Sequence, residues 1–117
     1  MIKVEFFVDK KKKSAELSVT GHAEMAEEGK DLVCAASSIL AYTAEAAVSE
    51  LKGKLSEEPK VKMQTGIAVI SCVARSKRAY REIVRSLLII MNGYKILAES
   101  FPEYIKYSSN VWLGEKP

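Results

Sequence analysis

The sequence contains one histidine and two cysteines, and the histidine shares a single stretch, Gly21 to Leu40, with one of the cysteines. A cysteine thiolate is a strong nucleophile, and an imidazole can take up its proton and pair with its charge. His22 and Cys34 could therefore form a nucleophile and its base. The alternative is that Cys34 is a small core residue and His22 an ordinary solvated or hydrogen-bonded side chain.

The segment that follows His22 has helical spacing, and Asp31 stands where its N-cap is expected. An Asp before an apolar periodic run can accept hydrogen bonds from the unpaired amides of the first turn. We therefore predict a helix from Asp31 to about Lys52, stopped by Gly53, with Cys34 in its first turn. There the free amides and the macrodipole would favour a thiolate, and the same amides, including that of Cys34, could stabilise an oxyanion.

Two serines follow Cys34 at helical distance. Ser37 and Ser38 stand three and four residues beyond it, which places them on its side of the predicted helix. Ser38 could donate a hydrogen bond near the thiolate, or it could bond a backbone carbonyl, as helical serines commonly do.

The segment between His22 and the predicted helix is acidic and flanked by Gly21 and Gly29. Two flanking glycines are possible hinges, so we expect the loop from Ala23 to Glu28 to move and to close over a bound peptide. Three glutamates give this loop its charge, and we expect them to meet basic residues of a substrate: Glu24, Glu27 and Glu28.

The whole stretch resembles a known family, the ribosomal-processing cysteine proteases called Prp. The resemblance lies in a Gly-His-Ala triplet, a short loop, a Gly-x-Asp-aliphatic-Val-Cys-Ala motif and a Ser four residues beyond the Cys. This chain has Gly21-His22-Ala23, then Gly29 to Ala35, and then Ser38. Identity, order and the gap between His22 and Cys34 all fit, and weaker similarity in element order covers nearly the whole chain.

The resemblance implies a cysteine endopeptidase that removes a short N-terminal extension from a large-subunit ribosomal protein, cutting after an aromatic residue. It implies that Cys34 is the nucleophile and His22 the base, supported by Asp31 and Ser38. Asp31 would cap the helix or orient His22. Family members are homodimers, so a homodimer is also expected.

Alternation and helical spacing along the rest of the chain predict an α+β fold. We expect a two-layer domain in which two helices pack on a mostly antiparallel sheet, in the order strand, strand, helix, strand, strand, helix, strand. Besides the helix already described, the predicted elements are strands at 2–8, 14–20, 59–64, 67–74 and 105–111 and a helix at 76–100, with Trp112 near the end of the last strand.

Three details of these elements bear on the site and on assembly. The strand from Ile67 is apolar on both parities, which predicts a central strand covered on both faces, with Cys72 as inert core. The second helix should be interrupted at Asn92-Gly93. Its apolar stripe widens around Leu88 to Ile90, which suggests a dimer contact or a deeply buried helix.

Bulk composition sets the remaining expectations. A chain of 117 residues is one domain, 1–117, and no apolar run approaches the roughly 20 residues that cross a bilayer. We expect a cytoplasmic protein with reduced thiols, no membrane contact, no metal and no cofactor. The net charge of +3 is uneven, with basic blocks at Lys10 to Lys13 and from Arg75 to Arg85.

These blocks could contact ribosomal RNA weakly, or they could be solvated surface. Two functions without catalysis therefore compete with the protease. One is a ribosome-associated RNA-binding module. The other is a dimeric scaffold in which His22 and Cys34 do no chemistry.

Overall fold

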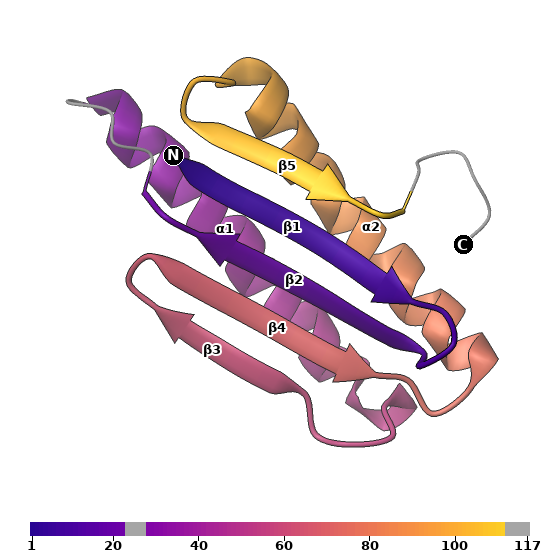
Figure 1. Cartoon of the computed structure of the whole chain (residues 1–117). Coiled ribbons are helices and arrows are strands. Elements are labelled where there is room, and N and C mark those ends of the chain that lie inside the picture. Colours follow the sequence, from indigo (N-terminus) through magenta and orange to yellow (C-terminus); the bar gives the residue numbers. More distant parts are fainter. Residues whose placement is uncertain (23–27, 112–117) are drawn as a thin grey trace.

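The computed structural model describes residues 1–22 and 28–111, which form one five-stranded sheet covered by two helices. The elements in chain order are β1 (Ile2–Asp9), β2 (Ser14–Thr20), α1 (Glu28–Glu50), the 3-10 turn η1 (Lys52–Lys54), β3 (Lys60–Gln64), β4 (Ile67–Val73), α2 (Lys77–Ser100) and β5 (Ile105–Ser109). The strand order in the sheet is β3-β4-β2-β1-β5, and β5 is parallel to β1 while the other pairs are antiparallel (Figure 1). The predicted α+β fold and element order are confirmed.

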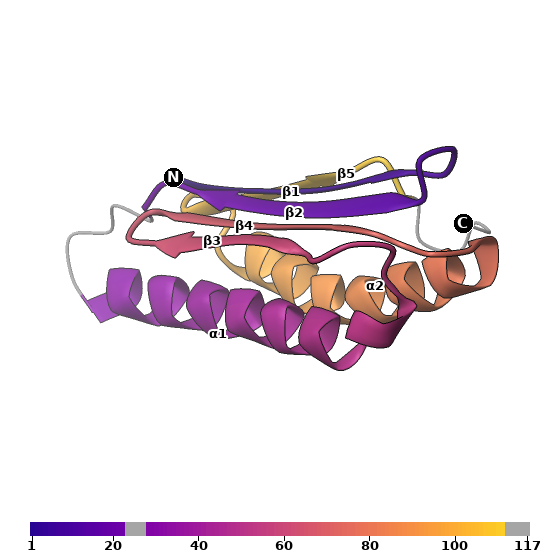
Figure 2. The ribbon, with the colours of Figure 1, turned by 90° about the horizontal axis from the view of Figure 1, so that it is seen from below.

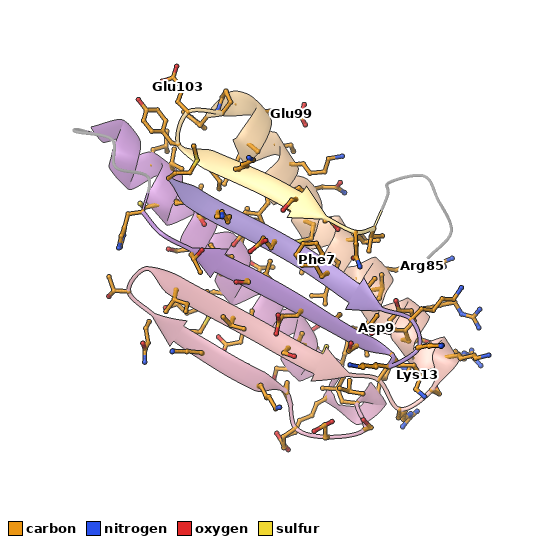
Figure 3. All side chains as sticks on the ribbon, viewed as in Figure 1. Phe7, Asp9, Lys13, Arg85, Glu99 and Glu103 are labelled. Atoms are coloured by element: carbon orange, nitrogen blue, oxygen red, sulfur yellow. The ribbon has the colours of Figure 1, made fainter. Side chains whose placement is uncertain are left out.

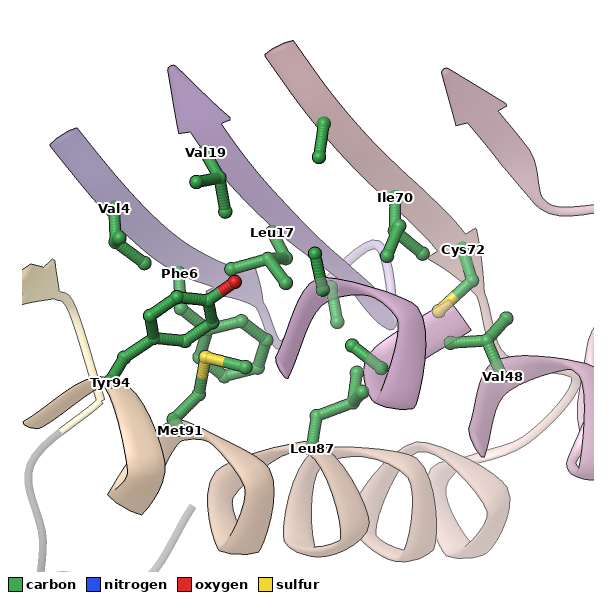
Figure 4. Close-up of a cluster of buried hydrophobic side chains, with 14 of the residues drawn as sticks. Val4, Phe6, Leu17, Val19, Val48, Ile70, Cys72, Leu87, Met91 and Tyr94 are labelled. Carbon is green, nitrogen blue, oxygen red and sulfur yellow. The ribbon is translucent and has the colours of Figure 1, made fainter. Parts of the chain in front are cut away.

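Both helices lie on the same face of the sheet (Figure 2). The alternate residues of the strands that point toward them are buried, including Val4 and Phe6 of β1, Leu17 of β2 and Ile70 of β4. Figure 4 shows these side chains packed against Tyr94, Met91 and Leu87 of α2 and Val48 of α1. The period-two alternation of the sequence thus gives the sheet its single buried face.

The prediction that β4 is covered on both faces is wrong. Ala68, Ile70 and Cys72 are buried under the helices, whereas Ile67 and Val69 on the opposite face are only half-buried. A strand with β2 on one side and β3 on the other is shielded at its edges by its neighbours, so it accepts apolar residues on an uncovered face.

The second helix is continuous, and the predicted interruption at Asn92-Gly93 is also wrong. A Gly inside a helix costs about 1 kcal/mol relative to Ala. Here, however, a Cβ on Gly93 would lie 2.5 Å from Leu40 Cδ2, so the missing side chain lets α1 and α2 approach closely. The buried Tyr94 next to it donates its hydroxyl hydrogen to the Ser37 carbonyl oxygen over 2.8 Å. This pair of contacts fixes the N-terminal half of α1 against α2.

The first helix begins at Glu28, earlier than the sequence predicted. Asp31 therefore lies inside α1 instead of at its N-cap, and Gly29 lies in the first turn instead of hinging a loop. Glu28 is the first helical residue and not part of the loop. Ala23 to Glu27, with the acidic residues Glu24 and Glu27, and Trp112 lie outside the described residues. The predicted loop closure stays a prediction.

The expectation that no apolar run is long enough to cross a bilayer does not hold for α1. Among the described residues, Leu32–Glu50 is long and apolar enough by length and composition, a test that core helices of globular proteins also pass. In this fold one side of the helix packs against α2 and the sheet. On its other side Leu32, Ile39 and Tyr42 are exposed.

Candidate active site

A cavity of about 550 Å³ lies at one end of the molecule, between the start of α1 and the edge of the sheet. Its walls come from the residues that follow β2, from the turn between β3 and β4, and from one face of α1. Figure 1 shows that these segments meet at the end of the molecule where the chain begins. His22, Cys34 and Ser38 all line this cavity. The structure therefore brings together three of the residues that the sequence singled out.

His22 is held by the pairing of β2 with β4. Thr20 lies opposite Ile67, so the chain that leaves β2 meets the β3–β4 turn. The Gly21 amide donates to the Gly66 carbonyl oxygen over 2.9 Å, and the Met1 nitrogen donates to the carbonyl oxygen of His22. The backbone around His22 is thus tied to the β3–β4 turn on one side and to the start of the chain on the other.

Two glycines make this arrangement possible. Gly21 has φ +92°, and a Cβ there would lie 2.3 Å from the Met1 carbonyl oxygen. Gly66 has φ +78°, and a Cβ there would lie 2.8 Å from Nε2 of the His22 imidazole. The imidazole therefore rests against the bare backbone of the β3–β4 turn. Gly21 was expected to act as a hinge, but its contacts indicate that it is a tightly packed turn residue.

Thr65 and Gly66 separate the predicted strands 59–64 and 67–74, and nothing in that spacing indicates a contact with His22. The Thr65-Gly66 signal predicts a hairpin turn and nothing more. That the turn touches His22 depends on β4 pairing with β2, which cannot be read from the local sequence.

Cys34 is the seventh residue of α1, and its side chain is half-buried. The neighbouring Val33 is fully buried and anchors this turn in the core. Ser37 and Ser38 follow on the cavity side, as predicted. Ser37 is buried and gives its carbonyl to Tyr94, whereas Ser38 is exposed to the cavity with its hydroxyl available.

The helix start changes the expected electrostatics of Cys34. The macrodipole acts mainly within the first turn, and an amide at the seventh helical position is normally bonded to the carbonyl four residues earlier. The prediction that Cys34 sits among free first-turn amides, with its own amide as oxyanion donor, is therefore wrong. Among the described residues that line the cavity with Cys34, His22 is the basic one.

The second thiol has a different environment. Cys72 lies in β4 under the helices with 4% of its surface exposed, and burial raises its pKa to about 11 despite a backbone hydrogen bond with Ala15. A thiol of this kind is protonated at neutral pH and inert. The prediction that Cys72 is core is confirmed.

We expect alkylation to distinguish the two cysteines in the folded protein. Iodoacetamide at pH 7 should modify Cys34 and leave Cys72 unmodified until the protein is unfolded, because Cys72 is both buried and protonated. Peptide mapping by mass spectrometry after timed labelling measures both sites in one sample. Modification of Cys72 at a rate comparable to that of Cys34 in native buffer would contradict the structure of this core.

No group of three or more His, Cys, Asp or Glu side chains that could hold a metal ion occurs in the described part of the chain. The cavity instead offers a thiol, an imidazole and a hydroxyl beside apolar walls from Ile2, Val19, Ala41, Met63 and Ala68. A histidine and an accessible cysteine beside an apolar cavity are the side chains that thiol-dependent enzymes use.

The comparisons with known proteins give the family within that class. A family model described as cysteine protease Prp matches residues 1–106, and the chain therefore belongs to the cysteine protease Prp family. It is a hydrolase that acts on peptide bonds. No curated protein sequence matches the chain significantly.

Two solved structures show the same fold over most of the chain. One is an essential ribosomal processing protease Prp from S. aureus with a covalently linked product peptide, at 25% identity and a TM-score of 0.66, covering 94% of this chain and 100% of that chain. Another is SMU.848 from Streptococcus mutans, at 26% identity and a TM-score of 0.67, covering 93% of each chain.

Proposed function

We propose that this protein removes a short N-terminal extension from a large-subunit ribosomal protein, with Cys34 as nucleophile and His22 as general base and acid. The observation that carries the proposal is that both residues, together with Ser38, line one cavity in a chain of a cysteine protease family. The similar S. aureus structure is a ribosomal processing protease that carries a covalently linked product peptide.

The proposed reaction has two halves. His22 takes the proton from Cys34, and the sulfur bonds to the scissile carbonyl carbon; the C–N bond then breaks as His22 gives that proton to the leaving amine. In the second half His22 takes a proton from water, whose oxygen bonds to the thioester carbon. The C–S bond breaks and the proton returns to the sulfur. The apolar cavity walls suit an aromatic residue before the cut.

Ser38 and Asp31 have supporting roles in this proposal. The Ser38 hydroxyl faces the cavity on the Cys34 side of α1 and can donate a hydrogen bond to the sulfur or to bound peptide. Asp31 lies inside α1, one helical turn before Cys34, so the capping role no longer applies and the orientation of His22 stays a prediction.

The direct test uses a synthetic peptide that spans the junction between the extension and the mature ribosomal protein. We expect a single cut after the aromatic residue at the junction, identified by mass spectrometry, and a transient acyl-enzyme on the tryptic peptide that contains Cys34. A matched peptide with alanine in place of that aromatic residue should be cut much more slowly. If the junction peptide stays intact after prolonged incubation with folded protein whose Cys34 thiol is reduced, the proposal is refuted.

We further propose that the protein acts as a homodimer in the cytoplasm, where its thiols stay reduced. The support for a dimer is a row of exposed apolar side chains on the two helices, of which Tyr42 also lines the cavity. Leu32, Ile39 and Tyr42 of α1 are 59%, 62% and 55% exposed, and Ile89 and Ile96 of α2 are 71% and 63% exposed. Residues three, four and seven apart share a helix face, which is the pattern of a helix-packing surface.

Replacing Ile39 by Glu should dissociate the dimer, because it places a charge in the middle of this apolar row. Sedimentation velocity at micromolar concentration should show a monomer for Ile39→Glu and a dimer for the unmodified chain. Phe7→Glu is the matched control, since Phe7 is 43% exposed but lies on the sheet, away from the helices. An unmodified chain that sediments as a monomer, or a control that dissociates equally, would argue against this interface.

A further inference from the structure

Two basic blocks that are far apart in the sequence lie together at one end of the molecule. The Ala74 amide donates to the Lys13 carbonyl oxygen over 2.8 Å, which joins the β1–β2 hairpin to the connection between β4 and α2. The Arg75 amide donates to the Lys54 carbonyl oxygen over 2.9 Å, and Arg75 Nη1 donates to the Gly53 carbonyl oxygen over 2.6 Å. Figure 3 shows Lys13 and Arg85 at this shared end.

We call this surface the basic end. It gathers more than half of the 18 lysines and arginines of the chain: Lys10, Lys11, Lys12, Lys13, Lys52, Lys54, Arg75, Lys77, Arg78, Arg81 and Arg85. Along α2 the residues Lys77, Arg81 and Arg85 follow one another at four-residue intervals, about 6 Å apart along the helix axis. The net charge of the chain is only +3, but the basic end carries a much higher local density of positive charge.

Three of the acidic residues nearby, Glu82, Glu58 and Asp9, are engaged within the basic end. Glu82 forms an ion pair with Lys54 Nζ at 2.8 Å and lies 3.7 Å from Arg78 Nε, and the hydrogen bond from Lys54 lowers the pKa of its carboxyl group. Glu58 pairs with Lys52 at 3.3 Å, and the Asp9 carboxylate accepts the Lys12 amide hydrogen over 3.0 Å.

The remaining cations of the basic end face solvent. In the described part of the chain no ion pair involves Lys10, Lys11, Lys12, Lys77, Arg81 or Arg85, and all six are exposed. Even the Arg78 side chain, which lies near Glu82, is 90% exposed. These charges are therefore available to an external polyanion.

The basic end lies far from the catalytic cavity. Strand β2 starts beside Lys13 and ends at Thr20, just before His22, so its seven residues separate the two sites by roughly 20 Å. Glu99 lies near the opposite end of α2, and Glu103 lies in the turn that follows this helix (Figure 3). A polyanion bound at the basic end would leave the cavity open and would be repelled from that end.

We propose that the basic end binds the phosphodiester backbone of RNA. RNA binding itself does not require the proposed protease function, but its biological purpose rests on that function. The purpose is to keep the protease on a particle made of ribosomal protein and RNA. RNA carries a continuous line of charge and can neutralise cations on the hairpin, η1 and α2 together.

A membrane surface fits the basic end less well than RNA. Basic surfaces that bind membranes usually carry exposed apolar anchors beside their charges. Among the described residues, no exposed large hydrophobic side chain lies within residues 10–13, 52–54 or 75–85, and only Phe7 and Ile89 flank these segments along the chain.

The test uses the full chain with Cys34→Ala, titrated with a fluorescent RNA hairpin at several salt concentrations. Reversing Lys11, Lys12 and Arg81 to Glu should weaken binding at least tenfold and reduce the slope of log affinity against log salt by about 2 to 3. The matched control reverses Lys3, Lys60 and Lys106, which are exposed on other parts of the sheet. This control variant has the same net charge as the variant with Lys11, Lys12 and Arg81 reversed, and its affinity for RNA should differ from that of the unreversed chain by less than about threefold.

Equal weakening by both triple variants would overturn the proposal, since it would show attraction by net charge alone. Stronger binding to vesicles rich in phosphatidylserine than to the RNA hairpin would also overturn it. The milder pair Lys11→Gln and Lys12→Gln should reduce the slope by about 1 to 2 and serves if the triple variant does not fold. Cleavage of the junction peptide by the charge variants with an intact Cys34 should be unchanged, so failure of RNA binding and failure of the proposed protease function give different results.

Discussion

Replacing Cys34 by alanine should reduce kcat/KM for a junction peptide by about 10⁴-fold or more, because no covalent intermediate can form. Replacing His22 by alanine should cost roughly 10² to 10⁴-fold, the usual contribution of a general base and acid. The double variant should be no slower than Cys34→Ala alone, since residues that act as one unit are not additive. Steady-state kinetics on the three variants and the unmodified chain measure this directly.

Alkylation separates this interpretation from a scaffold without chemistry. At pH 6 iodoacetamide should modify Cys34 faster than it modifies a free cysteine, and His22→Ala should remove that advantage, because the imidazole is the proposed partner of the thiolate. A scaffold predicts no such advantage and no effect of His22. Cys34 lies beyond the first turn of α1, so the helix dipole should contribute little to the reactivity of its thiol. Any advantage of Cys34 over a free cysteine should therefore depend on His22.

The sheet could be predicted from the sequence because its signal is local. Side chains that alternate between core and solvent at every second position mark β1 and β2 at nearly the observed bounds. The same signal misled for β4, where apolar residues on both parities suggested cover on both faces. Alternation reports which side chains avoid water, but it does not distinguish a covering helix from neighbouring strands.

The start of α1 was missed because two local signals pointed to a later residue. Gly29 reads as a helix breaker and Asp31 as a cap, yet both are tolerated in a first turn, where a carboxylate is favoured by the helix dipole. The predicted interruption of α2 at Gly93 was wrong because of a contact that is not local in the sequence. The glycine does weaken the helix locally, but the close approach of Leu40 from α1 compensates, and that contact joins segments distant in sequence.

Gly66→Ala should reduce kcat/KM by about 10²-fold while leaving the protein folded. The new Cβ would lie 2.8 Å from His22 Nε2, and the imidazole is the end of a flexible side chain, so it moves away more readily than the backbone does. A displacement of about 1 Å can cost 10²-fold in rate. The left-handed conformation at φ +78° adds strain of about 1 to 2 kcal/mol, which a thermal melt measures separately.

Gly53→Ala provides the matched control, because a Cβ at Gly53 would meet nothing within 4 Å. It should leave kcat/KM unchanged. A second comparison isolates the route of the effect: in a His22→Ala background, Gly66→Ala should cause no further loss of activity, since there is no imidazole left to displace. A further loss in that background would mean that Gly66 acts on the peptide or on the fold, and that the β3–β4 turn does not position the base.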